Sequence, residues 1–448
     1  MIENVFFKTM DSLGPFENKP HLAIGVSGGS DSLCLTLLCE KWVKRNGGKI
    51  SALVIDYGLR KNSKKEYEQF KKILNKKKIS NYLFKWDYGK RINSLQERAR
   101  DFRYKTFEEW CFKNNIFHLL IGHHFDDQKE TFLIRLNSNS DVYGLSSMSK
   151  ILFKKKIRIL RPLLSLNKEE IKDYLVKHKV KWIEDESNKS SKYTRNRYRK
   201  ALPILEREGL TNKKFQKLLQ NAKKKRKLSE NRVLNWLIKN VEINPLGYAT
   251  VVKKNLLFLN KKEFAIILNR ILMTISGKAH NIKNKNLINF FNKIVSNKIF
   301  PDSNLGGCHI FIDKKKGSDR IYICREIIRN TRKQTLKIIN DKFYWDDRFE
   351  IDMKKKKFLD FKKKINKSLY IDQLKLDGWK DINTKNNILK KNKRILIKLI
   401  ISLPAFKDKN KNILSVPHLN YYSNLKNKKL FSNINMSFKP TLGLTRFN

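Results

Sequence analysis

Ala23-Ile24-Gly25-Val26-Ser27-Gly28-Gly29-Ser30-Asp31-Ser32 is the stretch that decides the fold of this 448-residue chain. An apolar, β-prone run ends in two adjacent glycines, and an apolar helical pattern follows directly. This order predicts a strand, a tight loop and a helix. Adjacent glycines let backbone N–H groups approach an anion, and the positive end of the helix dipole points to the same place. The loop therefore predicts a phosphate-binding site and nucleotide chemistry.

Three better-known loops compete for this segment. A Walker A loop needs a lysine after its last glycine, and none follows Gly29. The dinucleotide fingerprint Gly-x-Gly-x-x-Gly fails because positions 27 and 30 are serines. Residues 25–29 also match Gly-x-Ser-x-Gly, the nucleophile elbow of serine hydrolases. An elbow normally follows several strands, and the short stretch before Gly25 leaves no room for them, which argues against a hydrolase.

The charge of the chain is strongly positive. It has 98 Lys and Arg against 42 Asp and Glu, which gives a formal net charge of +56. Abundant Lys, Asn and Ile indicate that compositional drift accounts for part of this excess. So lopsided a balance still favours a polyanion partner, with nucleic acid ahead of membrane.

The cysteines and the apolar runs indicate the compartment. The five cysteines, at positions 34, 39, 111, 308 and 324, form no C-x-x-C pair and no zinc pattern, so a reducing environment is expected. The first residues lack the layout of a signal peptide, and no apolar run is long enough to span a bilayer. We expect a soluble, cytoplasmic protein without membrane partners.

Strand and helix signals alternate from residue 21 to about 200. The predicted strands are 22–26, 50–56, 82–86, 118–122 and 157–160, and the predicted helices are 30–44, 63–77, 94–113 and 126–136. This alternation predicts the α/β class, with a doubly wound and mostly parallel sheet. We expect three domains: this one over 1–204, a basic and mainly helical one over 205–332, and a small mixed or β-rich one over 333–448.

Polar residues follow three of the predicted strands. Ser27, Asp56 and His123 stand at strand ends, where parallel sheets bind their ligands. After His123 the chain continues His-Phe-Asp-Asp-Gln-Lys-Glu-Thr, and its acids suit the first turn of a helix. They equally suit Mg²⁺ beside a triphosphate, so Asp126 and Asp127 are candidate metal ligands. His123 and His124 could be metal ligands, but both fit donors to phosphate or to a developing oxyanion better than they fit zinc ligands.

Two clusters of arginines add candidates. Glu97, Arg100 and Tyr104 recur at helical spacing with Arg103 beside them, and Arg195 and Arg199 follow an acidic stretch. A surface arginine usually has no special role, but arginines near a nucleotide crevice suit phosphate or carboxylate recognition. The run 223–227, Lys-Lys-Lys-Arg-Lys, is the densest charge of the second segment and is either a solvated face or an RNA contact.

Ser-Gly-Gly-x-Asp-Ser after a first strand resembles the signature loop of the PP-loop ATP pyrophosphatases. Within that superfamily the chain resembles the tRNA(Ile)-lysidine synthetases, over roughly residues 20–205. The matching motifs are, in order, Ser27–Ser32; residues 54–60, Val-Ile-Asp-Tyr-Gly-Leu-Arg; Glu97, Ala99-Arg100 and Arg103-Tyr104; residues 123–128 with Glu130-Thr131; Gly144-Leu145 with Met148; Arg161-Pro162-Leu163-Leu164; Glu184-Asp185 with Ser187-Asn188; and Arg195-Asn196 with Arg199.

The resemblance implies a ligase that uses ATP and Mg²⁺. It would join free lysine to C2 of the wobble cytidine in tRNA(Ile) with the anticodon CAU, through an adenylated tRNA, releasing pyrophosphate and AMP. The implied roles are ATP binding for Ser27, Gly28, Gly29, Ser30, Asp31 and Ser32; lysine binding for Glu97, Arg100 and Asp127; catalysis for Asp31, Asp127, His123 and Arg195; Mg²⁺ binding for Asp31 and Asp127; and phosphate or tRNA contact for Arg103 and Arg199. The segments 205–332 and 333–448 would both contact the tRNA.

Two other functions stay open. Another PP-loop enzyme that modifies tRNA, such as a thiolase, would share the loop, although such thiolases commonly carry the paired cysteines that this chain lacks. A non-catalytic RNA-binding protein on the same fold would be favoured by loss of Asp31 or of the acids at 126–131, and all of these are present. A homodimer stays open as an oligomeric state.

Overall fold

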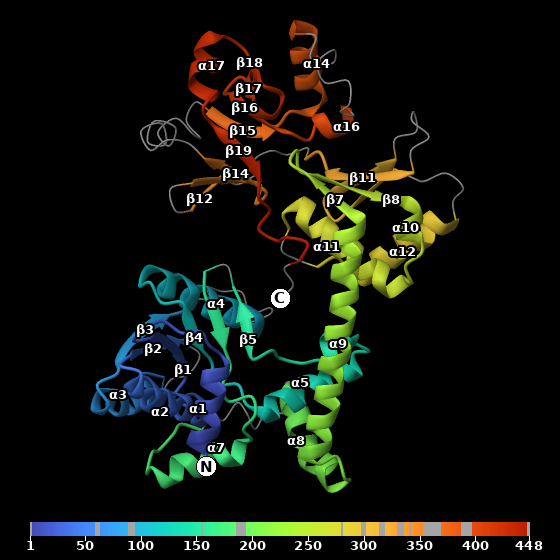
Figure 1. Cartoon of the computed structure of the whole chain (residues 1–448). Helices are drawn as coiled ribbons and strands as arrows, with labels where there is room; N and C mark the ends of the chain where they lie inside the picture. Colours follow the sequence, from blue (N-terminus) through green and yellow to red (C-terminus); the bar gives the residue numbers. More distant parts are fainter. Residues whose placement is uncertain are drawn as a thin grey trace. The chain divides into compact units, whose positions relative to one another are not determined.

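The computed structural model describes most of the chain, and it divides into two compact units. The described residues are 2–58, 63–87, 95–154, 156–184, 194–278, 281–296, 302–312, 319–328, 336–339, 342–352, 369–386 and 397–445. The first unit runs to Leu228 and the second begins at Ser229 (Figure 1). The helix α9 (Asn212–Asn240) continues through this division. The structure thus divides into two compact units, and the boundaries of the three expected domains stay a prediction.

The first unit is built on a six-stranded sheet in the order β3-β2-β1-β4-β6-β5. The pairs β3–β2, β2–β1, β1–β4 and β4–β6 are parallel, and the edge strand β5 pairs antiparallel with β6. The α/β class with a mostly parallel sheet is confirmed; β5 was not predicted. The strands are β1 (His21–Val26), β2 (Lys49–Asp56), β3 (Ser80–Lys85), β4 (His118–Leu120), β5 (Ile151–Phe153) and β6 (Arg158–Leu160).

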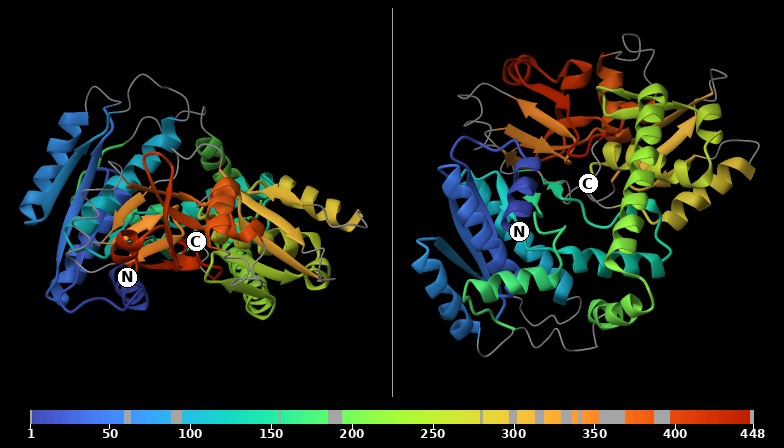
Figure 2. Two further views of the ribbon diagram at one scale, coloured as in Figure 1. Left: turned by 90° about the horizontal axis from the view of Figure 1, so that it is seen from above. Right: turned by 60° about the horizontal axis from the view of Figure 1, so that its bottom comes forward.

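Helices cover both faces of this sheet, because its strands are apolar on both sides. One face packs against α1, α2, α3 and α7, with Phe6, Leu35, Phe70 and Tyr174 in the shared core. The other face packs against α4 through Phe107 (Figures 1 and 2). The helices are α1 (Ile2–Ser12), α2 (Ser30–Arg45), α3 (Ser63–Lys76), α4 (Leu95–Lys113), α5 (Phe125–Asn137), α6 (Val142–Leu145), α7 (Lys168–Lys177) and α8 (Thr194–Arg207).

The second unit begins with helices around a five-stranded antiparallel sheet, β7-β8-β11-β10-β9. The sequence indicated a mainly helical segment here and missed this sheet, because apolar and polar residues alternate only weakly along its short strands. Its elements are β7 (Val241–Asn244), β8 (Tyr248–Val252), α10 (Lys253–Leu257), α11 (Lys261–Ser276), α12 (Asn284–Ser296), β9 (Ser303–Leu305), β10 (Cys308–Ile312) and β11 (Arg320–Arg325).

Two four-stranded sheets follow, in the orders β12-β13-β14-β19 and β15-β16-β17-β18. Their described strand pairs are all antiparallel. The elements are β12 (Leu336–Ile339), β13 (Lys342–Trp345), β14 (Phe349–Asp352), β15 (Leu369–Gln373), α14 (Lys375–Asn386), α16 (Ile397–Ile400), β16 (Pro404–Asp408), β17 (Ile413–Val416), the 3₁₀ helix η4 (Pro417–Leu419), β18 (Tyr421–Tyr422), α17 (Leu425–Phe431) and β19 (Asn435–Phe438). Among the described residues, no helix has both the length and the apolar character that a membrane crossing requires.

A buried ion cluster holds the turn between β13 and β14. Asp346 accepts hydrogen bonds from Arg325 at 2.9 and 3.1 Å and from Arg348 at 2.9 Å. The Arg348 side chain is 1 % exposed and stacks its guanidinium over the Phe349 ring, 5.1 Å from the centroid. Because these charges are out of water, each depends on its partner, and the cluster ties this turn to β11.

His418 predicts a pH-dependent stability. Burial, with Arg348 nearby, lowers its pKa to about 4 from the usual 6.5 of histidine, and its buried ring nitrogens have no hydrogen-bond partner among the described residues. The unfolded chain therefore takes up a proton first as the pH falls. We expect stability to be lost between about pH 6.5 and 4, at up to about 1.4 kcal/mol per pH unit.

His418→Phe keeps a ring beside Phe349, whose centroid lies 5.3 Å from that of His418, and removes the proton site. Urea unfolding at several pH values should show a shallower acid slope for this variant than for the unchanged chain. His178→Gln, at the exposed end of α7, serves as the control. Equal slopes for the His418→Phe variant and the parent would contradict the assignment.

Candidate active site

The carboxyl ends of the parallel strands open into a cavity of about 1250 Å³ within the first unit. Ser27 after β1, Asp56 at the end of β2 and His123 after β4 all line it, as their positions at strand ends predict. Residues of α3, α7 and α8 complete the wall. The cavity is large enough for a nucleotide together with a second substrate.

The glycine-rich loop adopts a backbone that other residues rarely take. Gly28 has φ of +79°, and a Cβ there would lie 2.7 Å from Phe70 and 2.8 Å from Ile183. The Ser32 hydroxyl accepts from the Ser27 N–H at 3.1 Å and donates to the Gly29 carbonyl at 3.0 Å. Ser32 therefore shapes the loop from within. The first N–H groups of α2, which lack partners in the helix, remain available to an anion.

Three carboxylates surround one imidazole in the lining of the cavity. The Nε2 atom of His124 lies 3.7 Å from Oδ2 of both Asp31 and Asp127, and its Nδ1 lies 3.5 Å from Oδ2 of Asp126. Burial lowers the pKa of His124, but the carboxylates more than offset this and leave it above the usual value. The imidazole therefore lies between the carboxylates at the starts of α2 and α5, and it attracts both when it is protonated.

A carboxylate pair on α5 positions two arginines of α8. The fully buried Glu130 accepts from Nε of Arg195 at 2.5 Å and from Nε of Arg199 at 2.7 Å. Arg195 also donates to Asp127 at 2.8 Å, and Asp127 accepts the His124 N–H at 3.0 Å. Burial raises the pKa of Asp127, but His124 and Arg195 outweigh it and lower the pKa overall. Asp127 is therefore an ionised, fixed carboxylate.

His123 is a neutral residue in a cationic environment. Burial lowers its pKa to about 3, and Arg161, Arg195 and Arg103 add to this. Its Nδ1 accepts from Nε of Arg161 at 3.2 Å, which leaves the proton of the neutral ring on Nε2. His123 lines the cavity, so it can offer a neutral hydrogen bond at neutral pH.

The candidates on α4 differ in position. Arg103 lines the cavity, and its guanidinium carbon lies 5.2 Å from the centroid of the Tyr104 ring. Glu97 and Arg100 are exposed and lie outside the described lining of the cavity. The Oη of Tyr104 and the Nε of Arg103 are buried without hydrogen-bond partners among the described residues. Because Glu97 and Arg100 lie outside the described lining, their role in lysine binding remains a proposal.

The residues fit a magnesium ion. Hard carboxylate oxygens are its preferred ligands, together with substrate phosphates. Asp31 and Asp127 each present Oδ2 within 3.7 Å of one imidazole nitrogen, so both face the same small volume beside the glycine loop. No cluster of three His, Cys, Asp or Glu side chains suited to a metal occurs in the described part of the chain.

Several site residues were missed as candidates. Glu130 and Arg161 lie inside motifs that the sequence analysis noted, but their partners are distant in the chain and carry no sequence signal. Lys168 contacts Asp31 with no signal beyond its place after an Asn cap. The motif residues Leu59, Arg60, Asp185, Ser187 and Asn188 lie outside the described part of the structure.

Comparison with known proteins identifies the family. Residues 2–205 match the model of the PP-loop domain family. The tRNA(Ile)-lysidine synthase of Orientia tsutsugamushi is 30% identical over 98% of both chains, and that of Rickettsia prowazekii is 32% identical over 90% of both. Among solved structures, the U34-tRNA thiolase NcsA from Methanococcus maripaludis matches 50% of this chain and 78% of its own, with 18% identity and a TM-score of 0.44. The similarity to the curated relatives extends through both units, and the chain belongs to the tRNA(Ile)-lysidine synthase family.

Proposed function

We propose that the chain ligates lysine to C2 of the wobble cytidine of tRNA(Ile) with the anticodon CAU, at the expense of ATP, in the cytoplasm. The observation that carries this proposal is one cavity that joins a phosphate-binding glycine loop to ionised carboxylates and arginines. The family membership supplies the substrates, and the cavity offers places for their charged groups. In the first step, the C2 oxygen attacks the α-phosphorus of ATP, and pyrophosphate leaves.

In the second step, the ε-amine of lysine attacks C2, the C2–O bond breaks, and AMP leaves with that oxygen. The loop Ser27–Ser32 would hold the departing pyrophosphate. Mg²⁺ held by Asp31 and Asp127 would neutralise phosphate charge. Because Asp127 stays ionised, it also suits orientation of the lysine ammonium, and the amine proton passes to a carboxylate or to water before attack. We assign Glu97 and Arg100 to the α-amino and α-carboxylate groups of lysine.

The cationic groups would act where negative charge develops. Arg195 and Arg199 are held in place by Glu130, so they can face a phosphoryl group without reorganising. His123 offers a neutral N–H to the same region, and Arg103, which also lines the cavity, would provide a phosphate contact. The target cytidine must leave its stack, because C2 is otherwise shielded.

One experiment tests the proposed reaction directly. Purified protein is incubated with ATP, lysine and a transcript of tRNA(Ile), and the anticodon nucleosides are analysed by mass spectrometry. We expect a cytidine that has gained lysine with loss of water, and pyrophosphate release that requires both lysine and tRNA. Product formed without lysine would favour another PP-loop modification, and intact ATP would favour a non-catalytic RNA-binding protein.

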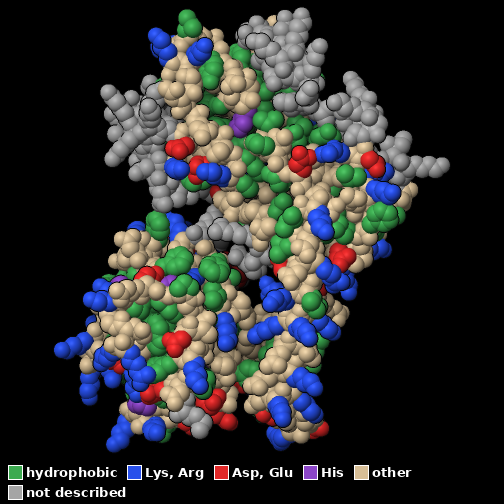
Figure 3. All heavy atoms as spheres, in the orientation of Figure 1, with side chains coloured by type: hydrophobic (Ala, Val, Ile, Leu, Met, Phe, Trp, Pro, Cys, Tyr) green, Lys and Arg blue, Asp and Glu red, His purple; other side chains and the backbone are tan. Residues whose placement is uncertain are grey.

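The helix α9 is the surface that we assign to tRNA. It carries ten basic residues and one acidic residue, and Figure 3 shows Lys and Arg side chains gathered along it. Phe215 and Leu219 are buried on its inner side, in a core shared with α5 and α8, so the basic residues are left outward. Among them, Lys224, Lys225 and Lys227 are exposed.

This assignment predicts a steep salt dependence of tRNA binding. Each phosphate contact contributes about 0.9 log unit of affinity per log unit of salt on duplex, and about 0.7 on single strands. Lys224→Gln/Lys225→Gln/Lys227→Gln should flatten the slope by roughly two units, as measured by filter binding over a salt series. The matched control removes three exposed lysines elsewhere, Lys72, Lys76 and Lys105, and should leave the slope nearly unchanged. A salt-independent affinity would contradict the assignment.

A further inference from the structure

One lysine connects the glycine loop to the acids of α5. Lys168, the first residue of α7, places Nζ 2.5 Å from Oδ1 of Asp31 and 2.9 Å from Oγ of Ser30. Its backbone N–H donates to Oδ2 of Asp126 at 2.8 Å. The side chain and the backbone of this one residue therefore bind the starts of two different helices, α2 and α5.

Four other Lys and Arg side chains line the cavity in the described part of the chain, and their partners lie elsewhere. Nζ of Lys172 lies 4.0 Å from Oε1 of Glu184, and the guanidinium carbon of Arg103 lies 5.2 Å from the centroid of the Tyr104 ring. The Lys129 ammonium is buried and held by Asp126 at 2.5 Å and by Asn212 at 2.9 Å, so it is fixed. Arg199 is engaged with Glu130. Lys168 contacts the glycine loop itself, and its side chain is 36% exposed, which leaves it room to change partner. It is therefore the best placed of these lining cations to meet a phosphate on the loop.

We propose that Lys168 binds the β- and γ-phosphates of ATP. Without nucleotide, its ammonium neutralises Asp31, whose carboxylate would otherwise repel an arriving triphosphate. When ATP enters, the ammonium turns from Asp31 to phosphate oxygens, and Asp31 becomes free for the cation that accompanies ATP. A lysine suits this exchange because its ammonium has three donors on a flexible stem. The proposal rests on the proposed use of ATP and adds a residue to it.

The geometry allows the ammonium to be removed without loosening α7. The anchor to Asp126 comes from the backbone N–H of Lys168, which every residue except proline retains. The helix is also capped independently, because Asn167 accepts the Glu170 N–H at 2.9 Å and Glu170 accepts the Asn167 N–H at 2.8 Å. Lys168→Met therefore deletes the charge and keeps the length of the side chain and the helix start.

The test compares ligands that contain or lack the outer phosphates. Binding of ATP, inorganic tripolyphosphate and AMP is measured by calorimetry on the full chain and on Lys168→Met, Lys168→Arg and Lys177→Met. For Lys168→Met we expect about a tenfold or greater loss of affinity for ATP and tripolyphosphate, the order of one charge-assisted hydrogen bond, and unchanged affinity for AMP. Lys168→Arg should keep part of the affinity.

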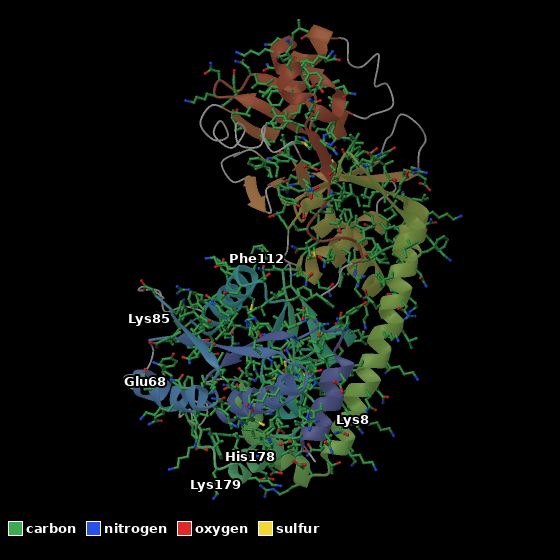
Figure 4. All side chains as sticks on the ribbon, turned by 60° about the vertical axis from the view of Figure 1, so that its left-hand side comes forward. Lys8, Glu68, Lys85, Phe112, His178 and Lys179 are labelled. Atoms are coloured by element: carbon green, nitrogen blue, oxygen red, sulfur yellow. The ribbon has the colours of Figure 1, made fainter. Side chains whose placement is uncertain are left out.

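Lys177→Met removes an exposed charge from the last turn of the same helix, near His178 and Lys179, which Figure 4 labels, and should bind all three ligands like the parent. Two results overturn the inference: equal ATP and tripolyphosphate binding by Lys168→Met and the parent, or an equal loss for AMP, which would indicate a structural role. Failure of the proposed function is distinguishable, because lysidine formation by the parent is measured separately. A parent that binds ATP and tripolyphosphate but forms no lysidine would refute the proposed reaction and leave this inference standing.

Discussion

Asp31→Asn is expected to reduce lysidine formation by roughly 10²–10³-fold, the order seen when one preorganised electrostatic group is removed from an active site. Asn keeps the shape of the side chain at the start of α2, so the loop is retained. It loses the charge that faces the His124 imidazole at 3.7 Å and the Lys168 ammonium at 2.5 Å. It also loses a ligand for the cation that accompanies ATP. The measurement is the rate of pyrophosphate release with lysine and tRNA present.

The matched control for Asp31→Asn is Asp173→Asn on the exposed side of α7. It removes the same charge from the same unit, so it corrects for any effect of net charge on tRNA binding. We expect its rate to equal that of the parent chain. If Asp31→Asn released pyrophosphate within about threefold of the parent, Asp31 would have no part in catalysis.

Glu130→Gln is expected to affect both stability and activity. The carboxylate is 0 % exposed and holds Arg195 at 2.5 Å and Arg199 at 2.7 Å. The glutamine amide is uncharged, and its NH₂ group cannot accept a hydrogen bond. Only its oxygen could then accept from a guanidinium, so one of the two arginines would lose its partner in this residue. Breaking a fully buried ion pair lowers the free energy of unfolding by about 3–5 kcal/mol. Because both arginines keep access to solvent, we expect Glu130→Gln to lower it by roughly 2 kcal/mol. Activity falls further, since neither guanidinium is then held for a phosphoryl group.

Unfolding by urea measures the first effect, and lysidine formation at saturating substrates measures the second. Glu109→Gln on the exposed side of α4 is the control and should change neither. A double-mutant cycle with Arg199→Lys separates the pair from other contacts of either residue. An unfolding midpoint equal to that of the parent would contradict the structural role of Glu130, and unchanged activity would contradict its positioning role.

The regular elements of the first unit follow from local pattern. All five predicted strands and all four predicted helices are present, because apolar runs of four to eight residues and helical spacing are local properties of the chain. The antiparallel edge strand β5 (Ile151–Phe153) was missed because three residues carry no periodicity. The five-stranded sheet of the second unit was missed for a similar reason, since α11 and α12 dominate the pattern around it.

The partners of the site residues could not be predicted in the same way. Glu130 and Arg195 are 65 positions apart, and Asp31 and Lys168 are 137 apart. Nothing in a linear pattern pairs such residues. The sequence also treated His123 and His124 as similar, whereas the structure places one against Arg161 and the other among three carboxylates. Adjacent residues that leave a strand point in different directions, and the surrounding helices decide what each one meets.

By itself, therefore, the order of residues determined a phosphate loop between a strand and a helix, the parallel sheet behind it and the type of chemistry at its edge. These depend on backbone preference, apolar spacing and residue type, which neighbours in the chain already specify. Only the tertiary structure decided which acid holds which cation, and that Lys168 contacts the loop. Charge pairing depends on distances of a few ångströms between helices that folding alone brings together.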